Sequence, residues 1–276
     1  LPGRAGTGAV DVAAFWLGAL LVVGFVLDTA ANRQTDLVIA AIVVTGGLLL
    51  ARGRSISAGL AFGLAAAFKC TPLLFAPYLA WKRRFVAAGA VVVAAVGLNL
   101  LPDVAYPPAD GKARLALWKD RFLAPMSDAN RDPGQWASAV ALAAFWRKSG
   151  VVEAGPALAA ELGVVCALML MLSPMSSKPH FTPLLLAQLV IVRVGFARRD
   201  RVLIGLAALV AAGGLCTGKD IVGKTVYEFM MWNGLLSGLT VALFLGCCRA
   251  RVLANRAGQA GGAAPAAVVT EVRRAA

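Results

Sequence analysis

The sequence predicts an all-α fold, a polytopic bundle of transmembrane helices. Apolar residues make up 59% of the 276 residues, 15% are charged, and the mean hydropathy is +0.76. A soluble domain has about 45–50% apolar and about 25% charged residues, so a water-soluble fold is excluded. The 27 Lys and Arg residues outnumber the 14 Asp and Glu residues, but they cluster at the ends of apolar segments. This pattern indicates membrane topology rather than a nucleic-acid surface.

Eight apolar segments are candidates for crossing a bilayer, which takes roughly 20 mainly apolar residues per helix, or fewer where the bundle is thin. They cover residues 10–27, 37–51, 85–101, 136–146, 156–172, 181–196, 202–216 and 226–248. With this count every basic cluster lies on the cytoplasmic side, where Lys and Arg collect. The clusters are Arg52/Arg54, Lys82/Arg83/Arg84, Arg147/Lys148, Arg198/Arg199/Arg201 and Arg249/Arg251.

The apolar stretch 55–81 is an exception to this alternation, because basic clusters flank it on both sides. Both of its ends should therefore face the cytoplasm. Its two arms, 57–69 and 72–81, would be only about 20 Å and 15 Å long as helices. We expect a re-entrant or broken helical hairpin, whose non-helical backbone is tolerated at that depth only when protein buries it or it lines a cavity.

The outer side then receives residues 28–36, 102–135, 173–180 and 217–225. Segment 102–135 is too long for a plain connector, and its apolar residues between Leu115 and Leu123 favour an amphipathic helix on the membrane surface over a disordered loop. We divide the chain into a membrane domain, 1–253, and a disordered cytoplasmic tail, 254–276. The chain begins with Leu1-Pro2-Gly3, without Met or a charged leader, so we expect a fragment that lacks its N-terminal part.

No metal site is expected from the metal-ligating residue types. The chain has one histidine, which excludes a multi-histidine site, and its five cysteines show no CxxC spacing. All five lie in or beside apolar segments, so we interpret them as small buried hydrophobic residues rather than ligands or disulfide partners.

Lys69 is the most informative residue. It lies inside an apolar run, where a charged side chain costs about 2.5 to 3.5 kcal/mol on insertion scales. Thr71 is a good N-cap and Pro72 suits the first helical position, so a new helix is expected to present free N–H groups to the same place as the ammonium. A lysine beside a helix start predicts an anion site. The alternative is a lysine that extends from the hairpin tip to the outer surface.

These residues carry a family resemblance. The matching elements are Arg52-Gly53-Arg54, the run from Gly59 through Phe68-Lys69-Cys70-Thr71-Pro72 to Leu74, Pro77-Tyr78, Lys82-Arg83-Arg84, and the turn Leu172-Ser173-Pro174-Met175-Ser176-Ser177-Lys178-Pro179-His180. Together they resemble glycosyltransferase family 87, also known as domain of unknown function 2029.

The resemblance implies a C-type glycosyltransferase, similar to the mannosyltransferases that build cell-envelope glycolipids. Its hexose donor would be linked to a polyprenyl phosphate, and its acceptor would be a glycolipid or glycan at the outer face of a bacterial plasma membrane. The expected partners therefore include membrane lipids but not nucleic acid. The resemblance implies no cofactor and leaves metal dependence open. The donor phosphate, which is also the leaving group, would bind at Lys69 and Thr71.

Further site residues follow from the resemblance with departures from the family pattern. In the Ser-Pro turn, Ser177 and Pro179 replace the family's Trp and first His, which leaves Lys178 and His180 as donor contacts; a plain surface turn is the alternative. Arg33 stands where the family has Gly, and it either adds a phosphate contact or sits among lipid headgroups.

Acceptor contacts and the general base are less well matched. Gln34 carries over directly from the family's Gly-Gln-x-Asn element and is a candidate acceptor contact. Glu228, inside the predicted last span, is either an acceptor contact or a partner of Lys219 or Lys224. The acidic base of such enzymes follows the first span. We expect it in the missing N-terminal part, with Asp28 and Asp36 as weak substitutes.

Two other functions fit the same residues. A broken hairpin with a charge at its tip is also how transporters build midplane sites, so a transporter or lipid flippase without transferase activity is the alternative. A chain without the first outer loop would be an accessory subunit or an inactive fragment. The resemblance favours the transferase.

Overall fold

The computed structural model describes residues 35–108, 111–123, 155–171, 182–217 and 219–262, with short stretches between 12 and 30. Every regular element in this part of the chain is helical, which confirms the all-α fold class. The elements are α2 (Asp36–Ala51), α3 (Ser55–Phe68), the 3₁₀ turn η1 (Thr71–Leu74), α4 (Phe75–Trp81), α5 (Phe85–Ala105), α6 (Arg114–Trp118), the π turn η2 (Lys119–Leu123), α9 (Pro156–Met171), α10 (Leu184–Arg198), α11 (Arg201–Cys216), α12 (Lys219–Val222), α13 (Lys224–Trp232) and α14 (Leu235–Gly262).

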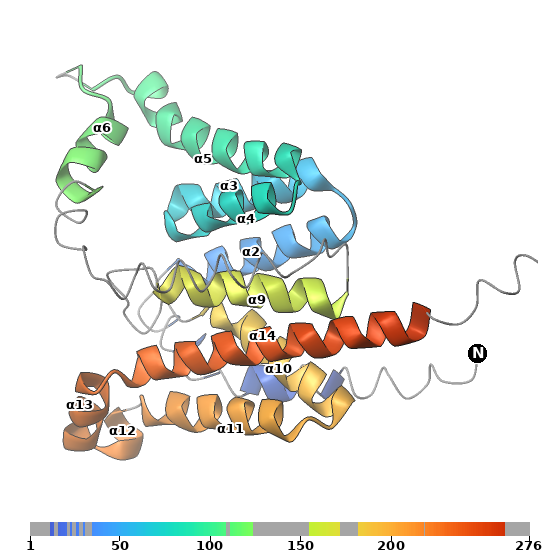
Figure 1. The fold of residues 1–276 in the computed structure, drawn as a ribbon. Coiled ribbons are helices and arrows are strands. Elements are labelled where there is room, and N and C mark those ends of the chain that lie inside the picture. Colours follow the sequence, from blue (N-terminus) through green and yellow to red (C-terminus); the bar gives the residue numbers. More distant parts are fainter. Residues whose placement is uncertain are drawn as a thin grey trace, which may run out of the picture.

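The long helices lie side by side, with α9 at the centre of the bundle (Figure 1). Helices α3, α4 and α5 lie on one side of it, and α10, α11 and α14 on the other. Helix α9 packs against α14, α10, α2 and η1, and its side chains from Ala157 to Leu170 are buried on nearly every side. It is therefore the helix that joins the two parts of the bundle.

Two described helical segments are long and apolar enough to cross a membrane, Phe85–Ala105 and Leu235–Arg256. Four shorter apolar helices accompany them, Asp36–Ala51, Ser55–Phe68, Pro156–Met171 and Arg201–Cys216. Among the predicted crossings, 136–146 lies outside the described residues and 10–27 is described only in part. The number of eight crossings therefore stays a prediction.

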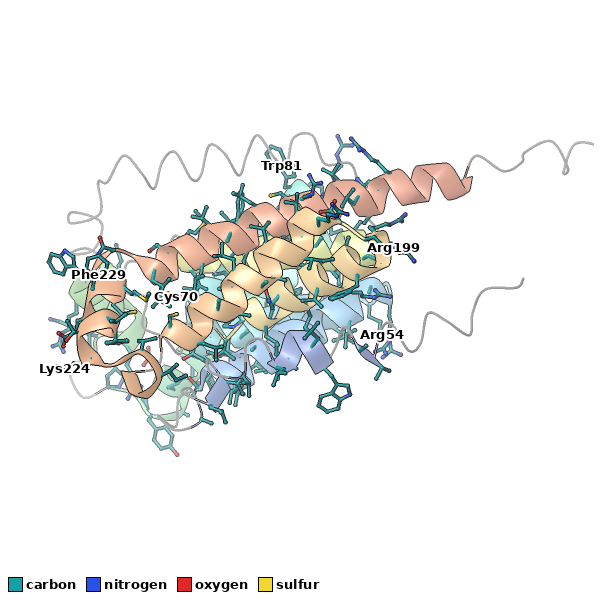
Figure 2. All side chains as sticks on the ribbon, turned by 90° about the horizontal axis from the view of Figure 1, so that it is seen from below. Arg54, Cys70, Trp81, Arg199, Lys224 and Phe229 are labelled. Carbon is teal, nitrogen blue, oxygen red and sulfur yellow. The ribbon has the colours of Figure 1, made fainter. Side chains whose placement is uncertain are left out.

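Short basic turns join the antiparallel helices. The turn from α2 to α3 contains Gly53 with a φ of +74°, and Arg83 and Arg199 also have positive φ in the turns before α5 and α11. Figure 2 shows Arg54 and Arg199 at one end of the bundle, whereas Cys70, Lys224 and Phe229 lie at the other. The turns that carry Arg54 and Arg199 thus share one end, as the alternation of predicted spans requires.

Small residues bring α3 close to α5. A Cβ at Gly63 would lie 2.6 Å from the Val91 carbonyl oxygen, and Gly59 is similarly crowded by α5 one turn earlier. On the opposite side, Gly46 of α2 leaves room for the ring of Phe62, which stacks on Phe75 with centroids 4.1 Å apart. The spacing of Gly59 and Gly63, Gly-x-x-x-Gly, is typical of closely packed membrane helices.

The hairpin is broken where the sequence predicts it, with one local difference. Helix α3 ends at Phe68 and the next turn begins at Thr71, so Cys70 rather than Thr71 is the N-cap residue, and it makes no side-chain cap. The turn is a four-residue 3₁₀ segment with Pro72 in its first positions. The second arm of the hairpin therefore starts with a 3₁₀ turn, and α4 continues it from Phe75.

Three predicted boundaries differ from the structure. The predicted span 226–248 is two helices, because Asn233 and Gly234, with its φ of +72°, separate α13 from α14. Helix α14 continues to Gly262, past the predicted start of the tail at 254. Helix α5 includes Pro102 and runs to Ala105. Beyond the end of α5, the described helical part of segment 102–135 is α6 with η2, and Arg114 binds Asp103 at 2.7 Å.

Candidate functional site

Lys69 and Asp36 form an ion pair that joins the residue after α3 to the first residue of α2. The Lys69 ammonium donates to Asp36 Oδ1 at 2.6 Å. Asp36 is the first residue of α2, and Lys69 follows α3 in an extended conformation, with φ −152° and ψ 127°. The Asp36 side chain is only 5% exposed and that of Lys69 is 24% exposed. The pair is thus partly buried, with its open side on Lys69.

A narrow, mostly filled pocket is lined by both residues of this pair. Segments far apart in the sequence meet there: α2, the break of the hairpin, the second half of α9, and the residues before α10. The lining residues are Asp36, Ile39, Lys69, Thr71, Cys166, Met169, Leu170 and Pro183. Charged and hydroxyl groups therefore line one wall, and apolar side chains of α9 line another.

An apolar groove lies between α2 and α3. It starts at Leu37, the residue after Asp36, and has about 810 Å³ of empty space including open solvent. Its one polar side chain, Thr45, donates its hydroxyl to the Ala41 carbonyl oxygen at 2.8 Å. The lining residues are Leu37, Val38, Ala41, Ile42, Thr45, Ala61 and Leu64. Asp36 and Leu37, neighbouring residues of α2, thus line the pocket and the groove respectively.

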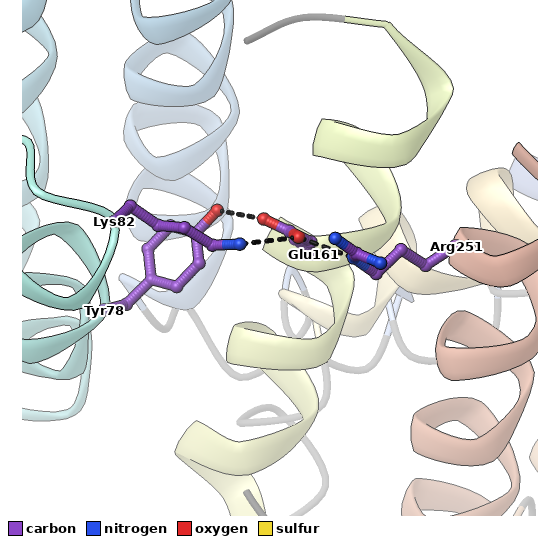
Figure 3. A network of polar contacts seen from close by, with 4 residues as sticks. All are labelled: Tyr78, Lys82, Glu161 and Arg251. Carbon is purple, nitrogen blue, oxygen red and sulfur yellow. Dashed lines mark hydrogen bonds and ion pairs between the residues drawn. The ribbon is translucent and has the colours of Figure 1, made fainter. Parts of the chain in front are cut away.

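Glu161 is the centre of a second polar cluster (Figure 3). Tyr78 Oη donates to Glu161 Oε2 at 2.8 Å, and Lys82 Nζ donates to Oε1 at 2.8 Å. Arg251 Nε donates to the same Oε1 at 2.6 Å. Glu161 is fully buried on α9, and its donors come from α4, the turn after it, and α14. The cluster joins three elements at the end of the bundle that carries the basic turns.

Glu161 is not among the site residues predicted from the sequence. It lies within the apolar segment 156–172, as Lys69 lies within 55–81, and a charge in such a segment needs a partner. The signal that identified Lys69 could therefore have identified Glu161. Its partners Lys82 and Arg251 were interpreted only as topology signals.

Asp200 and Arg249 form a more exposed contact at the same end. Asp200 is the N-cap of α11 and accepts from Leu203 N at 2.9 Å. Arg249 of α14 donates to both of its carboxylate oxygens, with Nη2 to Oδ2 at 2.8 Å. These hydrogen bonds, that of Arg249 first, hold the pKa of Asp200 below its ordinary value.

The structure brings together three of the predicted site residues, Lys69, Thr71 and Asp36. Glu228 lies apart from them on α13, where its carboxylate is exposed and 3.9 Å from the Lys224 ammonium one turn earlier. The alternative of a pairing with Lys224 is therefore the one observed. The remaining predicted residues lie outside the described part of the chain: Asp28, Arg33, Gln34, Lys178 and His180. Within the described part, no three His, Cys, Asp or Glu side chains gather as metal ligands would.

Comparison with known proteins gives one match. The sequence model of glycosyltransferase family 87 matches residues 2–196, which is more than two thirds of the chain. This is the family that the hairpin and turn motifs resemble. No curated protein and no solved structure matches the chain.

Proposed function

The chain belongs to glycosyltransferase family 87, and we propose that it is a membrane hexosyltransferase, similar to mannosyltransferases, that uses a polyprenyl-phosphate sugar as its donor. The acceptor is a lipid or glycan at the outer face of a bacterial plasma membrane. Membership of the family implies a glycosyltransferase with a sugar donor and an acceptor. The lipid-linked donor goes beyond what family membership implies, and the geometry around Lys69 supports it.

One observation carries the proposal: neighbouring residues of α2 line a pocket that holds an ammonium group and a groove of apolar side chains. Lys69 is held in the pocket by Asp36, and the groove begins at the next residue of α2. Such a pair of surfaces fits an amphiphile with an anionic head and an apolar chain. A polyprenyl phosphate has this form, since its phosphate would meet Lys69 and Thr71 while its chain lies between α2 and α3. A soluble sugar nucleotide would leave the groove unused.

Lys69 has a defined role in this proposal. As the sugar leaves, negative charge grows on the lipid phosphate, and an ammonium already in place lowers the energy of that state. Asp36 holds the ammonium when no donor is bound. The contact favours this holding role for Asp36 over the role of general base, because its carboxylate is already engaged. Arg33, Lys178 and His180 are proposed as further donor contacts.

The acceptor side of the reaction is proposed from the sequence alone. Gln34 precedes α2 by two residues and is assigned to the acceptor. Glu228 is a weaker assignment, since it lies on an exposed helix beside Lys224. Asp28 remains a weak substitute for the general base.

The sidedness of the site follows from the charges. The turns that carry Arg54 and Arg199 lie at one end of the bundle, and Cys70, the neighbour of Lys69, lies at the other (Figure 2). Cytoplasmic loops collect Lys and Arg, so the Lys69 pocket belongs at the outer face.

A transfer assay tests this proposal. The full-length protein in lipid vesicles receives polyprenyl-phosphate mannose labelled in the sugar, with or without a lipid extract of the source bacterium as acceptor. We expect labelled glycolipid and free polyprenyl phosphate only when the extract is present. Lys69→Ala should lower the rate at least about 100-fold, since it removes the main charge facing the leaving group. Lys119→Ala, an exposed lysine on η2, is the matched control and should keep the wild-type rate.

Two results would overturn the proposal. The first is transfer at the wild-type rate by folded Lys69→Ala. The second is movement of the labelled lipid across the bilayer without a new glycosidic bond, which would make the chain a transporter.

A further inference from the structure

Helix α9 contacts the broken hairpin at two separate places. Near its end, Cys166, Met169 and Leu170 line the pocket that contains Lys69 and Thr71. Near its start, Glu161 binds Tyr78 and Lys82, at the far end of the second hairpin arm. At 1.5 Å per residue, these places are about 8 to 14 Å apart along α9. The second arm therefore lies along α9 and is attached to it at both ends.

The contact at Glu161 leaves little freedom. Glu161 is fully buried, and each carboxylate oxygen accepts a hydrogen bond of 2.8 Å from the hairpin. Arg251 of α14 adds a third donor at 2.6 Å, so the carboxylate is held from a second side. Figure 3 shows the hairpin donors and Arg251 reaching Glu161 from opposite sides. A displacement of the hairpin along α9 would break two charge-assisted hydrogen bonds at once.

The hairpin carries this restraint to the pocket. Residues 71–81 form one continuous helical segment, because η1 leads directly into α4. Phe75, in the middle of this segment, is buried and stacked on Phe62 of α3. A segment that is fixed at Tyr78 and Lys82 and rigid in between also fixes Thr71 and the neighbouring Lys69.

We propose that Glu161 is a positioning residue for the Lys69 site: by binding Tyr78 and Lys82 it sets the depth of the hairpin along α9, and so the place of the Lys69 ammonium in the pocket. Glu161 touches no substrate. Its effect on the reaction rests on the proposed function, whereas its effect on the hairpin does not. The two parts need different measurements.

The first measurement is steady-state kinetics of folded Glu161→Gln in vesicles with polyprenyl-phosphate mannose. We expect kcat/KM for the donor to fall about tenfold, mostly through a higher KM, because a displaced ammonium binds the phosphate less well. Glu161→Asp keeps a carboxylate and should recover most of the loss. A purely structural residue would instead lower the yield and the melting temperature and leave the KM of the folded fraction unchanged.

The second measurement needs no transferase activity. Cys70 is an exposed thiol next to Lys69, whereas Cys166 and Cys247 are buried. A water-soluble maleimide and mass spectrometry of the Cys70 peptide give the labelling rate at the hairpin tip. We expect at least a threefold change in this rate in Glu161→Gln. Asp200→Asn is the matched control, because it removes a carboxylate at the same end of the bundle as Glu161. Asp200 contacts α14 rather than the hairpin, so this variant should leave the Cys70 labelling rate unchanged.

Tyr78→Phe keeps the test decisive if Glu161→Gln does not fold. It removes one hydroxyl that donates to Glu161 and keeps the buried ring. Its labelling rate and KM should change in the same direction by a smaller factor. A folded Glu161 or Tyr78 variant with the wild-type Cys70 rate and the wild-type KM overturns the inference. Absence of any sugar transfer by the wild type contradicts the proposed function, and the Cys70 rates then decide the inference alone.

Discussion

In the proposed donor site, Asp36 holds the Lys69 ammonium in place and also competes with the donor phosphate for it. An ammonium that is a quarter exposed and bound to a carboxylate at 2.6 Å is stabilised without a donor molecule. A phosphate that binds Lys69 must share the ammonium with Asp36 or replace that carboxylate. The ion pair therefore stabilises the fold without a ligand, and under the proposed function it lowers the affinity for the donor phosphate.

This competition leads to a prediction for Asp36→Asn. The variant should melt at a lower temperature than the wild type, since Lys69 loses its charged partner. Added polyprenyl phosphate should raise its melting temperature more than that of the wild type, because the phosphate then supplies the missing negative charge. A thermal-shift titration in detergent measures both changes. Equal shifts in the two proteins would contradict the competition, and Lys69→Ala, which should show almost no shift, is the control.

The sequence predicted part of this site. Lys69 could be identified because a charge within an apolar run must have a partner or a ligand. The identity of that partner could not, because Asp36 is 33 positions away and its carboxylate looks like any helix-start acid. Glu161 is also a charge within an apolar run, but it lies inside the predicted span 156–172 and was interpreted only as part of that span. Contacts such as Glu161 to Arg251, separated by 90 positions, depend on how whole helices pack.

Small residues in α2 and α3 position the break that carries Lys69. Gly59 and Gly63 let α3 approach α5 closely, and Gly46 makes room for Phe62. The break after Phe68 then falls where α3, η1 and α9 meet. The sequence predicted the break from its flanking charges and from Pro72. The predicted N-cap was Thr71, but the structure has Cys70 in that position. A Thr-Pro pair is compatible both with the start of an α-helix and with the 3₁₀ turn that forms here.

The turn between α10 and α11 gives a prediction of pH dependence. Asp200 caps α11 and binds Arg249 of α14, and its pKa is lowered in the folded protein. A carboxyl group with a lowered folded pKa stabilises the fold above its ordinary pKa, about 3.9, and this contribution is lost as the pH falls through the lower value.

Asp200→Asn tests this contribution, since asparagine is as good an N-cap as aspartate and only the charge is removed. We expect the melting temperature at pH 7 to fall by about 1–3 °C, as for a partly exposed ion pair. The difference from the wild type should shrink as the pH is lowered from about 5 towards 3. Melting curves in detergent over this range measure it. A difference that stays constant over the range would show that the charge of Asp200 contributes nothing.

The bundle is thinner than its longest helices suggest. Helices α2, α9 and α11 have 16 residues each, which corresponds to about 24 Å, less than a hydrocarbon core of about 30 Å. The all-α class and the basic turns could be predicted from composition and charge. The central place of α9 could not, because apart from Glu161 its residues are as apolar as those of a helix facing lipid. Its fully buried surface appears only when the other helices are placed around it.

The orientation of the whole molecule can be tested directly. If the basic turns face the cytoplasm, Arg54→Cys and Arg199→Cys should be protected in intact cells from a maleimide that does not cross membranes, and Lys224→Cys should react. All three positions are exposed, so protection by the membrane rather than by the fold decides the result. Opening the cells should make the two arginine positions reactive, which controls for buried thiols. Peptide-level mass spectrometry separates these sites from Cys70. The opposite pattern would place Lys69 on the cytoplasmic side, where a donor at the outer face could not reach it, and it would contradict the orientation that the basic turns indicate.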